Sequence, residues 1–262
     1  MQNFFVVGDS HSNFFSGYEN LHFLNMRING QIVDIHTNQS LIQNFKIFHL
    51  GAVLAYNLNR YNSKTLGREK IEFLLNNNLI PPKENILCAF GEIDMRVHSI
   101  KQARMQNVSF QNVVDSILAN YLEFLIPLTK RNNVYVWGAV PTQKDNSPIN
   151  PEYPYFGTEI ERNLATKYFN ERLNEHCNKS GIKFLSIFDK LIDENYRTRS
   201  EFIADGCHLS QRAWLFAADV FSKAGISINF TEAWLKQVLT HSAQIQAKLN
   251  KAIALSQKWG GQ

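Results

Sequence analysis

The stretch Phe4-Phe5-Val6-Val7-Gly8-Asp9-Ser10 places a short apolar run directly before a glycine, an acid and a serine. Consecutive apolar residues that end at a turn signal are typical of a strand buried on both faces of a sheet. Because glycine permits a tight bend after such a strand, we expect the Ser10 hydroxyl at the mouth of the sheet, with its backbone N–H turned toward a ligand. This stretch therefore predicts a first buried strand that presents a nucleophile, although Gly-Asp-Ser alone also forms ordinary turns.

Further apolar runs repeat this pattern along the chain, at Ile47–Leu50, Ile86–Phe90, Val134–Trp137 and Ile182–Ile187. Segments with helical spacing of apolar residues lie between them, at about 52–77, 108–131 and 158–179. The last of these opens with Thr158 and Glu161, the pattern of a capping box. Strands and helices that alternate in this way predict an α/β fold with a parallel five-stranded sheet, right-handed crossovers and ligands at the carboxyl ends of the strands.

Residues 18–46 do not fit the bare alternation of strand and helix. Within them, Ile28-Asn29-Gly30-Gln31-Ile32-Val33 has an Asn-Gly turn signal between two short apolar pairs, which predicts a hairpin. We therefore expect an insertion at 18–46 inside a first domain that spans 1–229.

The end of the chain, 230–262, is predicted to be an appended amphipathic helix. Thr231–Trp259 has no glycine and carries apolar residues at helical spacing, with lysines exceeding glutamates. Such a helix packs on its own domain or pairs with a second copy to form a homo-oligomer. Attachment to an anionic membrane surface is the alternative.

Composition narrows the class of protein. The chain has 262 residues, of which 44% are hydrophobic and 19% charged, as in ordinary globular proteins. Its net charge of +4 is spread along the sequence, so we expect no nucleic-acid partner. The first residues lack a basic leader, and no run approaches the roughly 20 apolar residues of a membrane span. These features predict a cytoplasmic protein without a membrane span.

Cysteine usage and motif spacing argue against cofactors. Cys88, Cys177 and Cys207 are odd in number and none forms a Cys-x-x-Cys pair, which fits a reducing compartment better than a disulfide framework. No His, Cys or carboxylate cluster has the spacing of metal ligands, and there is no glycine-rich phosphate loop. The sequence therefore predicts neither a metal site nor a cofactor.

A candidate base lies far downstream, in Asp205-Gly206-Cys207-His208 just before an apolar helical run. An acid three residues before a histidine can bind one imidazole nitrogen while the other acts as a base, although a solvated turn with an idle histidine has the same sequence. Gly51 follows the second strand and can bring a backbone N–H to a reacting oxygen. The stretch Gly91-Glu92-Ile93-Asp94-Met95-Arg96 follows the third strand as a polar loop.

The order of Gly8-Asp9-Ser10, Gly51, Gly91-x-x-Asp94 and Asp205-x-x-His208 resembles the SGNH, or GDSL-like, hydrolase superfamily from Met1 to about Ala224. The resemblance implies a flavodoxin-like three-layer α/β/α sandwich. It also implies that Ser10 is the nucleophile, His208 the base and Asp205 the residue that orients His208, with the N–H groups of Ser10 and Gly51 in an oxyanion hole.

The third motif departs from this family, whose members usually have Gly-x-Asn-Asp there, with the asparagine amide donating to the oxyanion. In this chain Ile93 stands in place of that asparagine. Three interpretations are open. Arg96 supplies a charge-assisted donor, positioned by Glu92 or Asp94; two backbone N–H groups suffice for a weaker enzyme; or the site binds without catalysing. His11 and His98 line the pocket or are ordinary loop histidines.

The function that these motifs favour is that of a serine esterase acting on O-acyl esters, above all O-acetyl esters, whose alcohol is a small molecule or a glycan. The reaction would pass through an acyl-serine intermediate. A carbohydrate O-acetyltransferase would use the same site, because both reactions share the first half. A glycan-binding module that kept the fold without catalysis is the other alternative.

Overall fold

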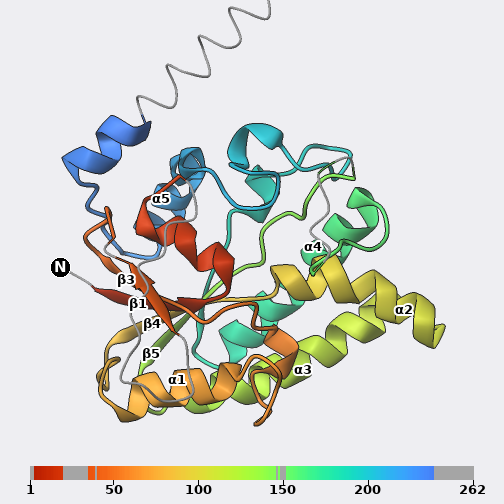
Figure 1. The fold of residues 1–262 in the computed structure, drawn as a ribbon, viewed down its shortest axis with the longest axis horizontal. Helices are drawn as coiled ribbons and strands as arrows, with labels where there is room; N and C mark the ends of the chain where they lie inside the picture. The colour runs from red at the N-terminus through yellow and green to blue at the C-terminus, as the bar shows by residue number, and fades with distance from the viewer. Residues whose placement is uncertain (1–2, 20–34, 39, 146, 148–151, 239–262) are drawn as a thin grey trace, which may run out of the picture.

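The computed structural model describes residues 3–19, 35–38, 40–145, 147 and 152–238. Its central sheet has six strands in the order β2-β3-β1-β4-β5-β6 (Figure 1). The strands are β1 (Phe4–Gly8), β2 (His36–Asn38), β3 (Phe45–His49), β4 (Asn85–Ala89), β5 (Asn133–Trp137) and β6 (Lys183–Leu185). Strands β3, β1, β4, β5 and β6 are mutually parallel, as the apolar runs predicted.

The prediction of five strands was wrong by one edge strand. Strand β2 pairs antiparallel with β3, with His36 opposite His49. Its sequence, His-Thr-Asn, is short and polar, so no apolar run marks it. It comes from the predicted insertion 18–46, whose predicted hairpin at 28–33 lies outside the described residues.

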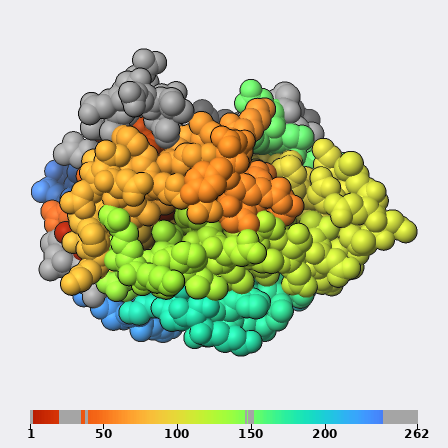
Figure 2. Space-filling view, turned by 90° about the horizontal axis from the view of Figure 1, so that it is seen from below, coloured from red at the N-terminus to blue at the C-terminus, as the bar shows by residue number. Residues whose placement is uncertain are grey.

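Helices cover both faces of the sheet (Figure 1). They are α1 (Gly67–Asn76), α2 (Ile100–Gln106), α3 (Phe110–Leu128), α4 (Glu159–Lys179) and α5 (Trp214–Lys223). Successive side chains of a strand point to opposite faces: Val7 belongs to the core under α1, α3 and α4, whereas Val6 belongs to the core under α5. Figure 2 shows green α3 between the orange chain of residues 50–66 and teal α4. The chain is thus the predicted three-layer α/β/α sandwich.

Helix boundaries follow local chemistry. The capping box is present at the start of α4, where Glu161 N–H donates to Thr158 Oγ1 and Thr158 N–H donates to the Glu161 carboxylate. The helix predicted at 52–77 is shortened to α1, because Asn62 and Leu66 adopt positive φ angles of 57° and 51°, which end regular helix.

The segment after β4 is helical rather than the predicted loop. Residues 92–106 form one helix that contains a π-helical stretch, η3 (Asp94–Ser99), before α2. Its N-terminus, which carries partial positive charge, lies at the carboxyl end of β4. The third motif is therefore presented by a helix start.

The predicted terminal helix begins inside the described residues, with residues 232–238 helical; its remainder lies outside them. Trp234 is buried, stacks on Phe230 with ring centroids 4.1 Å apart, and donates from Nε1 to Gln211 Oε1. The start of this segment thus packs on the α5 side of the sheet. Among the described helices, none is both long and apolar enough to cross a membrane.

Candidate active site

Ser10 lies where β1 gives way to a short 3₁₀ helix, η1 (Ser10–Ser16). Asp9 caps this helix, with Oδ1 accepting the His11 N–H at 2.9 Å, as expected for a turn aspartate. A Cβ on Gly8 would lie 2.6 Å from the Ala89 carbonyl oxygen, so only glycine lets β1 approach β4 this closely. Ser10 is the first residue of η1, and its N–H therefore belongs to the donors without an acceptor inside the helix.

His208 and Asp205 complete a hydrogen-bonded chain with Ser10. His208 Nε2 lies 2.8 Å from Ser10 Oγ, and His208 Nδ1 lies 2.8 Å from Asp205 Oδ2. Asp205 Oδ1 also accepts the backbone N–H groups of Cys207 and His208. Burial of Asp205 opposes ionisation, but these hydrogen bonds and the His208 charge hold its pKa below the ordinary value. The predicted nucleophile, base and orienting acid are therefore in contact.

Gly51 lies just beyond β3 with φ of +83°, a conformation that favours glycine. Its loop is fixed from two sides. Lys70 Nζ of α1 donates to Leu50 O at 2.8 Å, and Asp94 accepts the N–H groups of Ala55 and Tyr56 at 2.8 and 3.1 Å. Both carboxylate oxygens of Asp94 are therefore engaged by backbone donors, so this residue holds the loop rather than facing a substrate oxygen.

The pKa of Asp94 reflects this position. Complete burial raises it to about 7, against the lowering effect of the two backbone donors. Asp9, also fully buried, has a pKa raised to about 6, chiefly by burial, although His11 lowers it. Burial thus moves the pKa values of both acids toward neutral pH.

A buried network links Glu92, Arg96 and His11. Glu92 Oε1 accepts from Arg96 Nε at 2.7 Å, and Glu92 Oε2 lies 3.0 Å from His11 Nε2. Arg96 Nη1 also donates to the Tyr153 carbonyl. Burial alone would raise the pKa of Glu92, but Arg96 and His11 lower it to about 2. The expectation that Glu92 positions Arg96 fits this geometry.

His11 is the member of the network that lies against the catalytic histidine candidate. The His11 and His208 ring centroids are 4.9 Å apart. Burial opposes protonation of His11, but Glu92 raises its pKa well above the ordinary value. In the described part of the chain, His11 Nδ1 is buried and has no hydrogen-bond partner. His11 therefore has one ring nitrogen paired with Glu92 and one without a partner, and its ring lies beside that of His208.

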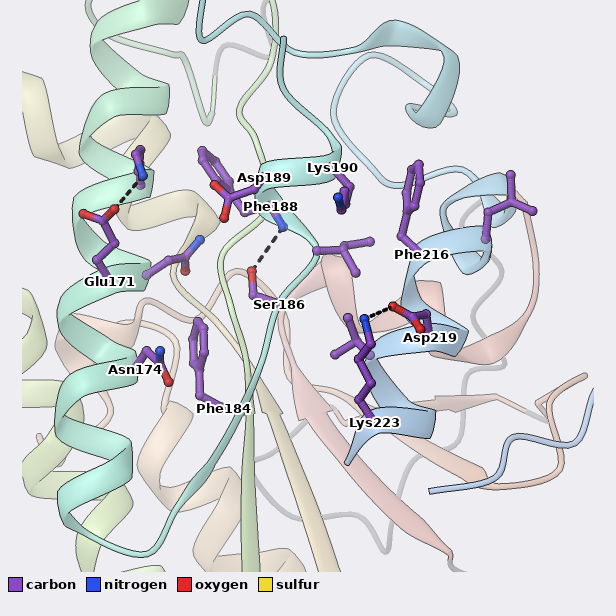
Figure 3. A pocket seen from close by; sticks show the side chains of 15 residues that line it. Glu171, Asn174, Phe184, Ser186, Phe188, Asp189, Lys190, Phe216, Asp219 and Lys223 are labelled. Carbon is purple, nitrogen blue, oxygen red and sulfur yellow. Dashed lines mark hydrogen bonds and ion pairs between the residues drawn. The ribbon is translucent and has the colours of Figure 1, made fainter. Parts of the chain in front are cut away.

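Two larger hollows lie away from the Ser10–His208 contact. One, of about 430 Å³, is lined by Tyr56, Asp94 and His98. The other, of about 440 Å³, lies between α4, β6 and α5, beside Phe184 and Phe216 (Figure 3). Neither is lined by Ser10 or His208. Within the described residues, Ser10 and His208 are each only partly buried.

One further cluster of side chains has no local signature in the sequence. One ligand atom from each of His11, Cys207 and His208 lies within 4.8 Å of the other two, although the sequence predicted no metal-ligand group. The spacing rules missed it because His11 is 196 residues from Cys207. Only the fold brings these side chains together.

Comparison with known proteins supports the fold. A Streptococcus pneumonia protein described as a platelet activating factor has 15% identity and a TM-score of 0.51, over 85% of this chain and 83% of that chain. The two chains share the three-layer fold that the resemblance of the motifs implied. No protein-family profile and no curated protein matches the sequence.

Two further solved structures are similar to this chain. A GDSL-like lipase from Bacteroides thetaiotaomicron has 13% identity and a TM-score of 0.49, covering 85% of this chain and 87% of that chain. A carbohydrate acetylesterase from Sinorhizobium meliloti has 14% identity and a TM-score of 0.48, covering 86% and 99%.

Proposed function

We propose that this chain is a serine hydrolase of O-acyl esters that works through an acyl-serine intermediate at Ser10. The observation that carries the proposal is the 2.8 Å contact between Ser10 Oγ and His208 Nε2, with Asp205 2.8 Å from the other imidazole nitrogen. Nucleophile, base and orienting acid in one hydrogen-bonded chain are what acyl transfer requires.

In the first half-reaction, Ser10 Oγ attacks the ester carbonyl carbon while His208 Nε2 takes the hydroxyl proton. The tetrahedral intermediate collapses, its C–O bond to the alcohol breaks, and His208 returns the proton to the departing alkoxide. In the second half, water attacks the acyl-serine while His208 takes a proton from it, the C–O bond to Ser10 Oγ breaks, and His208 returns the proton to Ser10 Oγ as the carboxylic acid leaves. Asp205 keeps the Nδ1–H of His208 fixed throughout.

The oxyanion is held by the N–H groups of Ser10 and Gly51, with positive charge from the buried network in place of the missing asparagine. The network of Glu92, Arg96 and His11 is suited to this because Glu92 binds both cations. Arg96 was the residue predicted for this task, and the 4.9 Å separation of the His11 and His208 rings adds His11 as a second source of charge. Preorganised charge of this kind stabilises a developing oxyanion without reorganisation.

The substrate class follows from the openness of the site. Ser10, Gly51 and His208 are each only partly buried, and neither large hollow is lined by Ser10 or His208. An open nucleophile suits a short acyl group on a bulky alcohol better than a long acyl chain, which needs an apolar channel. We therefore propose acetyl esters of carbohydrates as the substrate, with a sugar hydroxyl replacing water if the chain is an acetyltransferase.

The test is burst kinetics with a chromogenic acetate ester, followed by mass spectrometry of the trapped chain. We expect an acetyl adduct on Ser10, no adduct and no turnover in Ser10→Ala, and labelling by a serine-directed fluorophosphonate that depends on His208. Ser12→Ala is the matched control, because Ser12 lies in the same turn but donates to the Asp9 carbonyl. Unchanged turnover in Ser10→Ala would exclude the acyl-serine mechanism, and a folded chain without adduct or labelling would favour the glycan-binding alternative.

A further inference from the structure

The side chains of His11, Cys207 and His208 come from opposite ends of the chain and meet beside Ser10. We propose that they bind one soft divalent cation such as Zn²⁺, and that the bound cation reversibly blocks His208. The inhibitory part rests on the proposed function, whereas cation binding stands independently of it. Imidazole nitrogen and thiolate sulfur are the ligands that Zn²⁺ prefers in proteins.

One pair of ligand atoms is already close to the separation that such a cation requires, and the widest pair must close by up to about 1.5 Å. Cys207 Sγ lies 4.0 Å from His11 Nε2, and the three ligand atoms lie within 4.8 Å of one another. With Zn–S near 2.3 Å and Zn–N near 2.0–2.1 Å, a tetrahedral ion holds sulfur and nitrogen about 3.6 Å apart. The Cys207–His11 pair is therefore already within about half an ångström of that separation.

The orientation of His208 selects its ligand atom. Nδ1 is taken by Asp205 at 2.8 Å, so Nε2, which faces Ser10, is the nitrogen left for a cation. A metal-bound histidine usually donates its other N–H to a carboxylate, which fixes the ring and strengthens the ligand. Asp205 already provides that contact.

A fourth position is open to water or to a carboxylate. His11 Nε2 lies 3.0 Å from Glu92 Oε2, so cation binding must displace this contact, and the His11 ring and the Cys207 thiol release their protons to solvent as the cation binds. The freed Glu92 oxygen borders the same space. Three protein ligands with one open position are the arrangement of sites that exchange their metal-bound partner. The two other cysteines, Cys88 and Cys177, are fully buried in the core and lie outside the cluster.

Binding would stop acyl transfer by a simple competition. The lone pair of His208 Nε2 that accepts the Ser10 proton would be donated to the cation instead. Ser10 would then lose its base, while its own side chain need not be a ligand. Cation binding should therefore require His208 but not the Ser10 side chain.

The binding test uses the full, metal-stripped chain titrated with Co²⁺ under anaerobic conditions. We expect a thiolate-to-cobalt charge-transfer band that saturates at one Co²⁺ per chain and disappears when Zn²⁺ is added. Cys207→Ser should lose the band and bind Zn²⁺ at least about tenfold more weakly in competition with a chromophoric chelator. Ser10→Ala and His176→Gln should keep both properties, the latter because His176 lies on α4 outside the cluster.

A wild-type chain without the band, or a Cys207→Ser chain that keeps it, would overturn the proposal. Circular dichroism shows whether each variant is folded. In the second arm, equimolar Zn²⁺ should abolish hydrolysis of the acetate ester and a chelator should restore it, with at least about tenfold more Zn²⁺ needed in Cys207→Ser. Stoichiometric binding without inhibition would overturn the blocking role alone. If no hydrolysis is found, the proposed function fails and the Co²⁺ arm still decides the cation site.

Discussion

Gln211 joins the His208 turn to the helix that begins at Ser10: its Nε2 donates to the carbonyl of Phe14 at 3.0 Å and to that of Tyr18 at 3.1 Å. The Gln211 side chain is almost completely buried and also accepts from Trp234 Nε1 at 2.9 Å. Ser10 and His208 are 198 residues apart in sequence. Gln211 therefore holds the turn that carries His208 against the segment that begins at Ser10.

Gln211→Leu should misplace His208 relative to Ser10 without removing either residue. Leucine has similar volume but leaves buried carbonyls and Trp234 Nε1 unpaired, which costs about 1–3 kcal/mol for each group left without a partner. Since a shift of about 1 Å can reduce turnover about 100-fold, we expect kcat for the acetate ester to fall by roughly 10- to 100-fold with KM little changed. Gln237→Leu is the control, because Gln237 donates to the carbonyl of Gly17, directly after η1, but does not lie in the His208 turn. Equal kcat values in the two variants would contradict a role of Gln211 in positioning His208 relative to Ser10.

Arg96 provides a direct test of the substitute oxyanion charge. Arg96→Gln removes the cation while keeping a hydrogen-bond donor, and loss of one oxyanion donor typically lowers turnover about 10²- to 10³-fold. We expect kcat to fall by about that factor, with a smaller change in KM, because the interaction is strongest in the transition state. Arg104→Gln is a matched control, since Arg104 lies on the same helix in an exposed pair with Glu161. An increase in KM with kcat unchanged would instead assign Arg96 to substrate binding.

Glu92 should govern the charge of His11. His11 carries a pKa raised well above the ordinary value, with burial opposing and Glu92 favouring its charged form. Glu92→Gln removes that favourable charge, so burial prevails and the pKa of His11 should fall below the ordinary value. Titration of the imidazole signals by NMR measures this directly, with His176 as an internal reference. A His11 titration that does not move in Glu92→Gln would show that another group holds the charge.

The sequence predicted those parts of the molecule whose signal is local. Apolar runs identify buried strands because both faces of the sheet are covered, and the capping box at Thr158 marks the start of α4. Strand β2 was missed because its three residues are polar and pair only with the edge of β3. The helix at 92–106 was missed because a glycine followed by charged residues resembles a loop, and its π-helical stretch breaks the regular spacing of apolar side chains.

For the candidate site, the order of the motifs was enough to predict that Ser10, Asp205 and His208 lie together. It did not separate the roles of Asp94 and Arg96, since both were expected near the oxyanion. The structure places Asp94 on the N–H groups of Ala55 and Tyr56, contacts that depend on how the loop after β3 folds back. Similarly, His11 and Cys207 become neighbours only when the whole sheet has formed, so no local sequence pattern predicts their contact.

Asp94 should make the stability of the fold depend on pH near neutrality. Its pKa is raised by burial from 3.8 to about 7, so between these values the folded chain holds a proton that the unfolded chain releases. The stabilising contribution of Asp94 is therefore complete at low pH and is lost as pH rises toward about 7, above which it changes no further.

Asp94→Asn cannot ionise and retains one oxygen to accept a backbone N–H. We expect its Tm, followed by circular dichroism, to fall less than that of the wild type between about pH 5 and about pH 8. The residual slope should come from groups that titrate in both chains. Asp9, whose pKa burial raises to about 6, and His11, whose pKa is raised well above the ordinary value, act in the same direction as Asp94. His49, whose pKa burial lowers to about 3, acts in the opposite direction. Asp189→Asn, at an exposed position, should keep the wild-type slope. Parallel Tm profiles for wild type and Asp94→Asn would mean that Asp94 stays ionised in the folded chain, because its two backbone donors then outweigh the cost of burial.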